Sequence, residues 1–392
     1  MTKRKFPFFP LAFLAVVFLL FVFLHDLFGG TFLASSAYNS YTLQANAWLN
    51  GRLDIGMDIP WLELAVYGGR YYVSFPPVPT LIVLPFAVAF GEATPDHLII
   101  ALLCLVMLAE TYGILRKAGC TERQSVFWSA FFILGSNLLW MCTEGGVWFL
   151  AQTANLCFCL AAIRFAQSDR RTLALAMVAL AVGCRPFSVF LFLPLVTLFL
   201  LRDKTAGTLS AKGVFLRLVL PLIPAALIAL AYMALNFARF RNPFEFGHNY
   251  LPEFSGAAQF AFRYIPENLK NLLRPVRFGD FMRLDYPLYD GFLLFLANPF
   301  FVLLFTRCRK PGVSGWTALC AMLLNFVCLL MHRTFGGWQF GARYLVDLFP
   351  CLLLLLLPSF KEKSPRNWEL VLAAFAVVFN LYGALAMHFL YA

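Results

Sequence analysis

The sequence has few charged residues: they make up 13% of its 392 residues, against about 25% in soluble globular proteins. It contains only five histidines and 20 acidic residues. It shows no internal repeat, no low-complexity tract and no segment typical of a separate soluble domain. These features exclude a disordered chain, collagen, a coiled coil and a protein with a water-soluble core.

Hydrophobic residues are abundant instead. They account for 61% of the chain, the mean hydropathy is +0.75, and 45 Phe, 22 Pro and 25 Gly indicate long apolar helices broken at intervals. This composition predicts an all-α polytopic membrane protein with a single integral-membrane domain over residues 1–392. The apolar runs predict about ten or eleven transmembrane or half-membrane helices.

The net charge of +11 comes from short basic clusters between the apolar runs. That pattern is typical of the cytoplasmic loops of membrane proteins, so we expect membrane lipids, and no nucleic acid, among the partners. The ten cysteines fall in or beside apolar segments or in short connections. None has the spacing of a zinc site, so we predict that they are packing thiols.

The ends of the chain are easy to orient. Lys3, Arg4 and Lys5 precede an apolar run over 6–24 with no cleavage site after it, which predicts an uncleaved first helix with a cytoplasmic N-terminus in a multi-pass protein of the cell membrane. The connections 202–217, 307–312 and 360–368 are basic and should also be cytoplasmic. Three long loops, 25–78, 238–290 and 332–344, should therefore meet on the outer face.

The middle of the chain allows two topologies. If the segments 79–91, 97–115, 126–142, 147–166 and 172–201 each cross once, the pairs Arg116-Lys117 and Arg170-Arg171 lie outside, against the charge rule. If 79–91 only dips into the bilayer and 172–201 is a hairpin of half-helices, both pairs return to the cytoplasm. In both topologies the chain has reached the cytoplasmic side of the membrane at Arg202.

The first outer loop predicts a short interfacial helix over 41–49, which should end at Gly51. Downstream lie Arg52, Asp54, Arg70 and Tyr72. Arginine binds phosphate with a planar fork, and a carboxylate can take a proton from an attacking hydroxyl, so this mixture suits a sugar-phosphate ligand. The alternative is that Arg52 and Asp54 simply pair and hold the loop.

The second outer loop is expected to form amphipathic helices on the membrane surface. Within it, His248, Asn249 and Glu253 could bind a sugar hydroxyl or a phosphate, although a lone histidine is more often structural. No second histidine lies at a metal-binding spacing. A divalent cation, if the reaction uses one, would need carboxylates such as Asp54 and Glu253 to meet in space.

The third outer loop combines glycines with Gln339 and Arg343. Glycine backbone can turn its N–H groups toward an anion, and we predict that Arg343 grips a lipid phosphate. The alternative is a structural pair with Asp347, four residues later on the same helical face. Arg185, between half-spans, should reach cytoplasmic headgroups or line a cavity.

Several of these motifs resemble the C-type integral-membrane glycosyltransferases, especially the branch with protein mannosyltransferases and bacterial lipopolysaccharide sugar transferases. The resemblance rests on Tyr41-x3-Ala45-x3-Leu49-x-Gly51, on Pro76-Pro77 before a short apolar segment ending Phe90-Gly91-Glu92, on Val182-Gly183-Cys184-Arg185-Pro186, and on Arg343-Tyr344-Leu345. It covers the first 120 residues, and the rest of the chain by architecture.

The resemblance implies an inverting glycosyltransferase that moves a sugar from a polyprenyl-phosphate donor to a cell-envelope glycan, lipid or protein on the outer face. The family's Asp-Glu pair before the tyrosine is replaced by Ala37 and Tyr38, so this is a divergent member. Phe75 and His97 also replace a common Lys and Arg. Another acid must then serve as the base.

The candidates for the base are Asp26, Asp54, Asp58 and Glu63. Asp54 is favoured, because Arg52 and the interfacial helix would hold it near the bilayer surface, and Asp26 is second. Two alternatives remain: a transporter or lipid-handling protein without chemistry, and a catalytically inactive member of the same fold. The lack of an internal two-fold repeat argues against a transporter.

Overall fold

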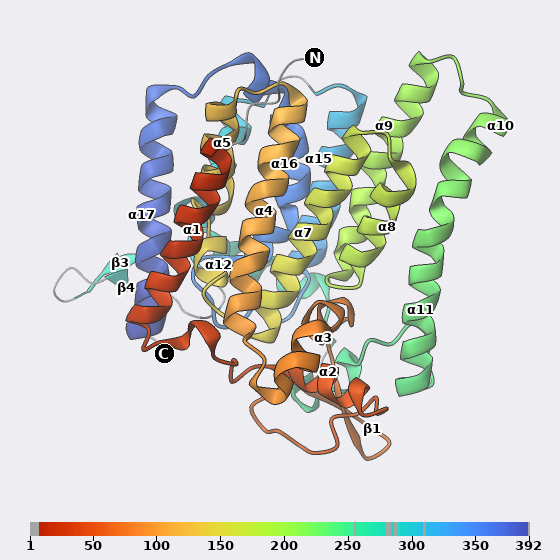
Figure 1. Ribbon diagram of the computed structural model, residues 1–392, viewed down its shortest axis with the longest axis vertical. Coiled ribbons are helices and arrows are strands. Elements are labelled where there is room, and N and C mark those ends of the chain that lie inside the picture. The colour runs from red at the N-terminus through yellow and green to blue at the C-terminus, as the bar shows by residue number, and fades with distance from the viewer. Residues whose placement is uncertain are drawn as a thin grey trace.

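The computed structural model describes residues 8–254, 256, 258–279, 284, 285, 289, 291–308 and 311–390. Lys3, Arg4 and Lys5, on which the orientation of the first helix depends, lie outside the described residues, as do parts of the second outer loop. The described chain forms a bundle of roughly parallel and antiparallel helices, with long loops and short elements gathered at one end (Figure 1). We call this end the loop end.

Eight helical segments of the described chain are long and apolar enough to cross a membrane. They contain α1 (Phe8–Leu27), α4 (Asp96–Ala118), α7 (Val147–Gln167), α9 (Phe192–Thr205), α11 (Ile223–Phe240), α15 (Val313–Leu330), α16 (Phe349–Glu362) and α17 (Asn367–Phe389). Two shorter apolar helices, α3 (Val78–Phe90) and α8 (Arg171–Val182), accompany them. The prediction of an all-α polytopic membrane protein with full and half-membrane helices is confirmed.

Less regular segments complete the bundle. They are α5 (Glu122–Ile133) with α6 (Leu138–Met141), and α13 (Leu294–Ala297) with α14 (Leu303–Thr306). Before α11, a short helix α10 (Ala211–Val214) leads into a π-helical turn over Phe215–Val219. Each break lies within one of the apolar segments expected from the sequence.

The basic connections all lie at the end opposite the loops. Lys117 bonds to Ser168, the amide of Gln124 donates to the Ser364 hydroxyl at 3.2 Å, and Arg307 reaches the carbonyl of Lys363 at 2.9 Å. We call this end the basic end; its charged residues include Arg116, Lys117, Arg170, Arg171, Arg202, Arg217, Lys361 and Lys363.

The arrangement resolves the topology of the middle segment. Helix α3 stays at the loop end, and α8 and α9 form a hairpin that turns near Arg185 and returns to the basic end (Figure 1). Of the two topologies that the sequence allows, the structure has the one with a dipping segment and a hairpin. The pairs Arg116-Lys117 and Arg170-Arg171 therefore share one end of the bundle, as the charge rule requires.

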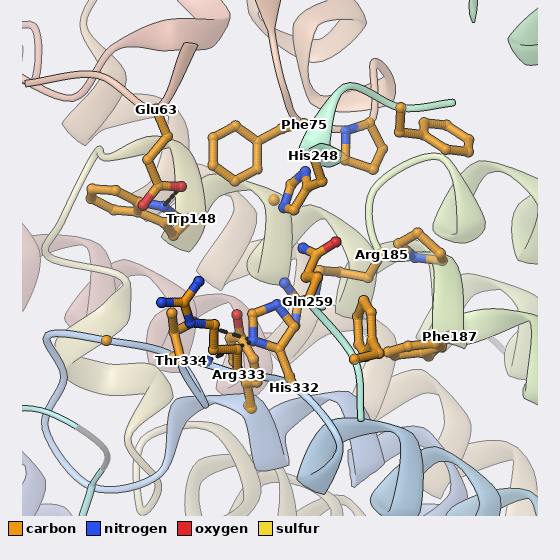
Figure 2. A pocket seen from close by; sticks show the side chains of 18 of the residues that line it. Glu63, Phe75, Trp148, Arg185, Phe187, His248, Gln259, His332, Arg333 and Thr334 are labelled. Carbon is orange, nitrogen blue, oxygen red and sulfur yellow. Dashed lines mark hydrogen bonds between the residues drawn. The ribbon is translucent and has the colours of Figure 1, made fainter. Parts of the chain in front are cut away.

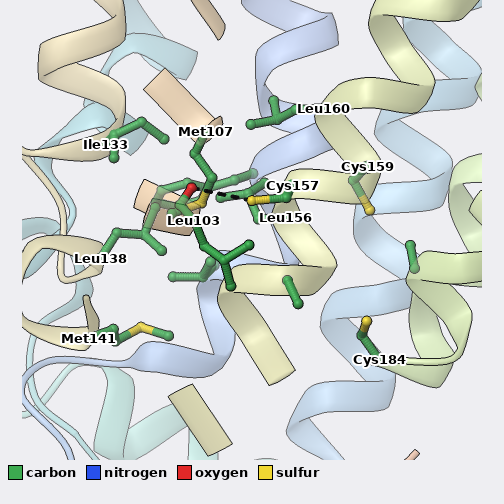
Figure 3. Close-up of a cluster of buried hydrophobic side chains, with 14 of the residues drawn as sticks. Leu103, Met107, Ile133, Leu138, Met141, Leu156, Cys157, Cys159, Leu160 and Cys184 are labelled. Atoms are coloured by element: carbon green, nitrogen blue, oxygen red, sulfur yellow. Dashed lines mark hydrogen bonds between the residues drawn. The ribbon is translucent and has the colours of Figure 1, made fainter. Parts of the chain in front are cut away.

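The bundle interior is filled by leucine, methionine and cysteine side chains where α4, α6 and α7 meet (Figure 3). The Cys157 thiol donates to the Leu103 carbonyl at 3.3 Å. Seven of the ten cysteines are buried free thiols: Cys104, Cys120, Cys142, Cys157, Cys159, Cys184 and Cys351. They pack as small apolar groups, as the sequence predicts, and close packing of this kind holds helices together in lipid.

A buried ion pair closes the basic end. The Arg307 guanidinium forms two bonds of 2.6 Å with the Glu369 carboxylate, and both side chains are at most 1% exposed. The same guanidinium lies 4.7 Å from the Trp128 ring centre and donates to the carbonyls of Ser359 and Ser364. It thereby ties α14, α16 and α17 together.

The loop end contains the predicted interfacial helix and a β-hairpin. Helix α2 (Ser40–Leu49) ends before Gly51, whose φ is +69°. Strands β1 (Leu64–Tyr67) and β2 (Arg70–Val73) pair antiparallel, with Leu64 opposite Val73.

The second outer loop differs from its prediction of amphipathic helices. Its described part has one eight-residue helix, α12 (Ile265–Leu272), several 3-10 turns and the short hairpin of β3 (Arg277–Phe278) and β4 (Leu284–Asp285). Gly247 and Gly256 have φ values of +106° and +84°. Those conformations interrupt a helix.

We predict that Glu369→Ala lowers the free energy of unfolding by about 3–5 kcal/mol, because it leaves the Arg307 charge buried without a partner. Replacing both residues, as Arg307→Met with Glu369→Leu, should cost much less. The thermal midpoint in detergent measures both effects. Glu92→Ala, which removes an exposed carboxylate, is the control. Equal midpoints for the single and double variants would contradict the assigned role.

Candidate functional site

A cavity of about 500 Å³ opens at the loop end. The first outer loop contributes Glu63, Phe75 and Pro76 to its lining, and the second contributes residues between 244 and 260. The third contributes residues between 332 and 344, and α7 and the α8–α9 turn complete the wall. Segments far apart in the sequence therefore enclose one space (Figure 2).

Six of the residues that the sequence nominates line this cavity: Glu63, Arg185, His248, Asn249, Glu253 and Arg343. The others do not. Asp26, Arg52 and Arg70 are exposed elsewhere at the loop end, Tyr72 packs on Phe240, and Gln339 is buried behind Arg343. Asp54 pairs with Arg70 at 3.5 Å rather than with Arg52, and this pair lies outside the cavity lining.

Of the four acids considered as the base, Glu63 is the one that lines the cavity, where Glu245 and Glu253 are the other acidic residues of the lining. It directly precedes β1, and the hairpin holds it in place, because the Ser74 hydroxyl after β2 donates to the Glu63 carbonyl at 2.9 Å. The Trp148 indole N–H donates to the Glu63 carboxylate at 3.1 Å (Figure 2). Burial raises the pKa of Glu63 above its ordinary value of 4.5, and the bond from Trp148 opposes part of that rise.

His248 lies beside Phe75 with a defined tautomer. Its Nδ1 atom is 2.6 Å from the Ser74 carbonyl, and a carbonyl only accepts, so Nδ1 carries the proton. Burial lowers the pKa of His248, which keeps the ring neutral. In that form Nε2 is an acceptor, able to receive a bond from a hydroxyl group.

His332 has the opposite tautomer. The backbone N–H of Thr334 donates to its Nδ1 at 3.2 Å, so Nε2 carries the proton of the neutral ring. Burial, with the nearby charges of Arg185 and Arg343, lowers the pKa of His332 to about 3. The cavity thus holds two neutral histidines, one with an acceptor and one with a donor at Nε2.

Arg343 is a buried cation with no carboxylate within ion-pair distance among the described residues. Its guanidinium donates to the Gly336 carbonyl at 3.0 and 2.6 Å and to the Gln152 amide oxygen at 2.8 Å. Its backbone N–H is held by Gln339 at 2.8 Å. Since these bonds use three of five guanidinium N–H groups, two remain for a ligand.

Arg185 is a second cation of the cavity, and its charge is compensated. It lies 2.9 Å from the Asp347 carboxylate and 4.6 Å from the Tyr344 ring centre. The alternative of a structural pair between Arg343 and Asp347 is therefore wrong, because Asp347 pairs with Arg185. Of the two positions expected for Arg185, cytoplasmic headgroups or a cavity, the structure has the second, since Arg185 lies at the hairpin turn that lines the cavity.

Arg333 adds an exposed cation, which donates to the Glu253 carbonyl at 3.4 Å and lies 5.7 Å from the Phe254 ring centre. Aromatic rings, among them Phe75, Trp148 and Trp338, form much of the remaining wall. Arginines that retain free donors bind phosphate, and aromatic faces accept the apolar face of a sugar ring. The cavity can therefore hold a sugar joined to an anionic group beside a buried carboxylate.

Sequence reasoning missed several lining residues, notably Trp148, His332 and Arg333. Trp148 lies inside an apolar span, where an aromatic residue carries no functional signal. The break at Gly183-Cys184-Arg185-Pro186 did mark Arg185 as unusual, because a charge inside a membrane span is rare. His332 and Arg333 stood at the start of the third loop with no motif around them.

The described residues contain no group of three or more His, Cys, Asp or Glu side chains arranged to hold a metal ion. Asp54 and Glu253 are the carboxylates that would share a divalent cation. They do not line one cavity, because Asp54 pairs with Arg70 outside the lining and Glu253 belongs to it.

A substitution at Gly336 tests whether the bonds to its carbonyl hold the Arg343 guanidinium in place. Its φ is +110°, and a Cβ there would lie 2.9 Å from the Gln339 amide. We expect Gly336→Ala to destabilise the protein by about 1–3 kcal/mol and to loosen Arg343. At Gly337 φ is +62° and a Cβ would meet nothing within 4 Å, so Gly337→Ala should cost only about 1 kcal/mol. Thermal midpoints that rank the two variants in the opposite order would refute this account.

No family model matches the sequence, and no curated protein matches it either. Solved structures do. ArnT from Cupriavidus metallidurans bound to undecaprenyl phosphate superimposes with a TM-score of 0.54 at 17% identity, over 94% of this chain and 63% of that one. ArnT from the same organism in the apo state gives 0.51 at 17% identity, over 89% and 60%.

An oligosaccharyltransferase from Archaeoglobus fulgidus gives a TM-score of 0.49 at 15% identity, over 100% of this chain and 55% of that one. The chain spans less than two thirds of the length of each of these structures. The ArnT superposition confirms, at the level of fold, the resemblance drawn from the sequence. The chain has the fold of the C-type integral-membrane glycosyltransferases.

Proposed function

We propose that this protein is a membrane glycosyltransferase that takes a sugar from a polyprenyl-phosphate donor and transfers it to a glycan, lipid or protein of the cell envelope. The observation that carries the proposal is the Arg343 guanidinium, buried in the cavity wall without a carboxylate partner among the described residues. A buried unpaired charge is costly, and an anionic ligand offsets that cost. The undecaprenyl phosphate bound to ArnT, which shares the fold, supports a lipid phosphate as that anion.

The donor would place its phosphate on the arginines and its sugar against the aromatic wall. Arg343 has two N–H groups left, and Arg333 is exposed at the same cavity. The cavity lies at the loop end of the helical bundle, where a lipid headgroup would sit with its chain in the bilayer. The positive-inside rule favours the basic end as cytoplasmic, which puts this cavity on the outer face.

Glu63 is the best candidate for the general base and takes that role from Asp54. Its carboxylate lines the cavity, where Trp148 bonds to it, whereas Asp54 pairs with Arg70 outside the cavity lining. In the proposed step the acceptor hydroxyl attacks the anomeric carbon from the side opposite the phosphate. The new C–O bond forms as the bond to the phosphate oxygen breaks, the polyprenyl phosphate leaves, and the hydroxyl proton passes to Glu63, so the configuration inverts.

The neutral histidines would orient the sugar. His248 presents an acceptor at Nε2 and His332 a donor, so the pair can bind two hydroxyl groups without adding charge. Keeping both rings neutral leaves the positive charge of the cavity concentrated at the arginines. The electrostatic attraction is then directed to the phosphate, on which negative charge builds up as it leaves.

The test compares Glu63→Gln with Asp54→Asn, measuring sugar transfer to envelope acceptors and retention of undecaprenyl phosphate by native mass spectrometry. We expect Glu63→Gln to lower transfer about a hundredfold to ten thousandfold while retaining the lipid. Asp54→Asn should change transfer by less than about fivefold, because it removes only an ion pair with the exposed Arg70, outside the cavity lining. Lipid retention with no transfer by the wild-type protein would instead indicate an inactive or lipid-handling member of the fold.

The pH dependence of transfer should report Glu63. A base must be deprotonated, so activity should rise with pH through a pKa above 4.5. Trp148→Phe removes a bond that stabilises the carboxylate, so the rise should move to higher pH. Trp338→Phe, which alters another indole of the cavity wall, is the control and should leave the profile in place. A shift to lower pH in Trp148→Phe would contradict the assignment.

A further inference from the structure

A second pocket, of about 390 Å³, lies at the basic end, away from the proposed active site. It lies between the start of α8 and the turn that leads into α11. Its lining is Asp169, Arg170, Arg171, Thr172, Leu173, Arg217 and Pro221. The glycosyltransferase chemistry proposed above uses none of these residues.

The inner side of this pocket is a closed ion-pair network. Asp203, which is 1% exposed, accepts bonds of 2.6 and 2.7 Å from Arg171 and lies 2.9 Å from Arg217. Asp169 lies 2.9 Å from Arg171 and 3.3 Å from Arg217. The network fixes the Arg171 and Arg217 guanidinium groups at the pocket wall.

The charges of the pocket do not balance. The lining contains Arg170, Arg171 and Arg217 but only one acid, Asp169. Asp203 and Arg202, which do not line the pocket, pair with this group, so four arginines meet two aspartates and two positive charges are in excess. Arg170 lines the pocket, is exposed, and forms no ion pair or side-chain hydrogen bond with the described residues. The N-terminus of α8, a helix of twelve residues, adds unsatisfied N–H groups to the same wall.

An apolar surface continues from the pocket along the bundle. Leu173 is 41% exposed. Leu216, Leu220 and Ile223, on one face of the helix that leads into α11, are 47%, 47% and 49% exposed. Helix α11 stands at the edge of the bundle and packs mainly against α8 (Figure 1). Cationic groups thus lie directly beside an exposed hydrophobic strip.

We propose that this pocket binds the phosphodiester headgroup of an anionic phospholipid, whose acyl chains lie on the strip of Leu173, Leu216, Leu220 and Ile223. Basic pockets between helices at a membrane surface bind such headgroups. A free phosphate would satisfy the arginines but not the exposed leucines beside them. The bound lipid would join α8 to the π-helical turn before α11, which contains Arg217.

The test uses Arg170→Glu, since this side chain has no partner in the network and its replacement should not disturb the fold. The full-length protein is placed in vesicles of phosphatidylcholine with one fifth phosphatidylglycerol, extracted, and its retained lipids are measured by native mass spectrometry. We expect the wild-type protein to retain phosphatidylglycerol and Arg170→Glu to retain about tenfold less. Inorganic phosphate should not displace the lipid.

Arg123→Glu is the matched control, because Arg123 is an exposed arginine near the start of α5 at the same end of the bundle. It makes the same change of charge outside the pocket and should retain the lipid like the wild-type protein. Equal loss of lipid in both variants would mean that lipid retention depends on the overall surface charge and not on this pocket, and it would overturn the proposal. Displacement by inorganic phosphate would overturn the assignment to a lipid.

Discussion

The arrangement of this protein depends on how a membrane bundle accommodates buried arginines. A guanidinium group away from water needs an anion or a full set of acceptors. Arg307 and Arg171 pair with carboxylates at the basic end. Arg185, in the cavity wall, pairs with Asp347. Arg343 has carbonyl and amide acceptors but no carboxylate partner among the described residues. Arg239 is also buried with only carbonyl and amide acceptors among the described residues, but it is not part of the cavity lining. Arg343 does line the cavity, so an anionic ligand bound there could supply the missing charge.

The hairpin of α8 and α9 is what makes such a cavity available. The hairpin turns back near Arg185 and does not fill the loop end. There the first outer loop packs against α7, and the Trp148 indole N–H donates to the Glu63 carboxylate. The backbone N–H of Val78 bonds to the Gly183 carbonyl at 2.9 Å, so α3 begins directly on that turn. The wall of the cavity includes the residues that follow the half-helix α8 and those that precede the dipping helix α3. Polar groups can line the cavity at these helix ends, whereas continuous helices would fill the same space with apolar side chains.

The sequence allowed the fold class to be inferred because the membrane imposes strong rules. Apolar runs of sufficient length, basic connections and proline breaks gave helices close to those observed, including the short helix that ends before Gly51. The site was harder. His248, Asn249, Glu253 and Arg343 were nominated because polar residues in glycine-rich loops stand out in an apolar chain. Glu63 was one of four acids considered, and nothing in its immediate sequence favoured it over Asp54.

By itself, the sequence determined that the chain forms a helical membrane bundle with its basic connections on one side, since hydropathy and charge act on each segment locally. It also determined that three polar loops would share one end. Only the tertiary structure decided which of the four candidate bases lines the cavity, which arginine pairs with Asp347 and which nitrogen of each cavity histidine carries the proton. Those choices depend on contacts between residues up to about two hundred positions apart, such as Arg343 with Gln152, and no local pattern encodes them.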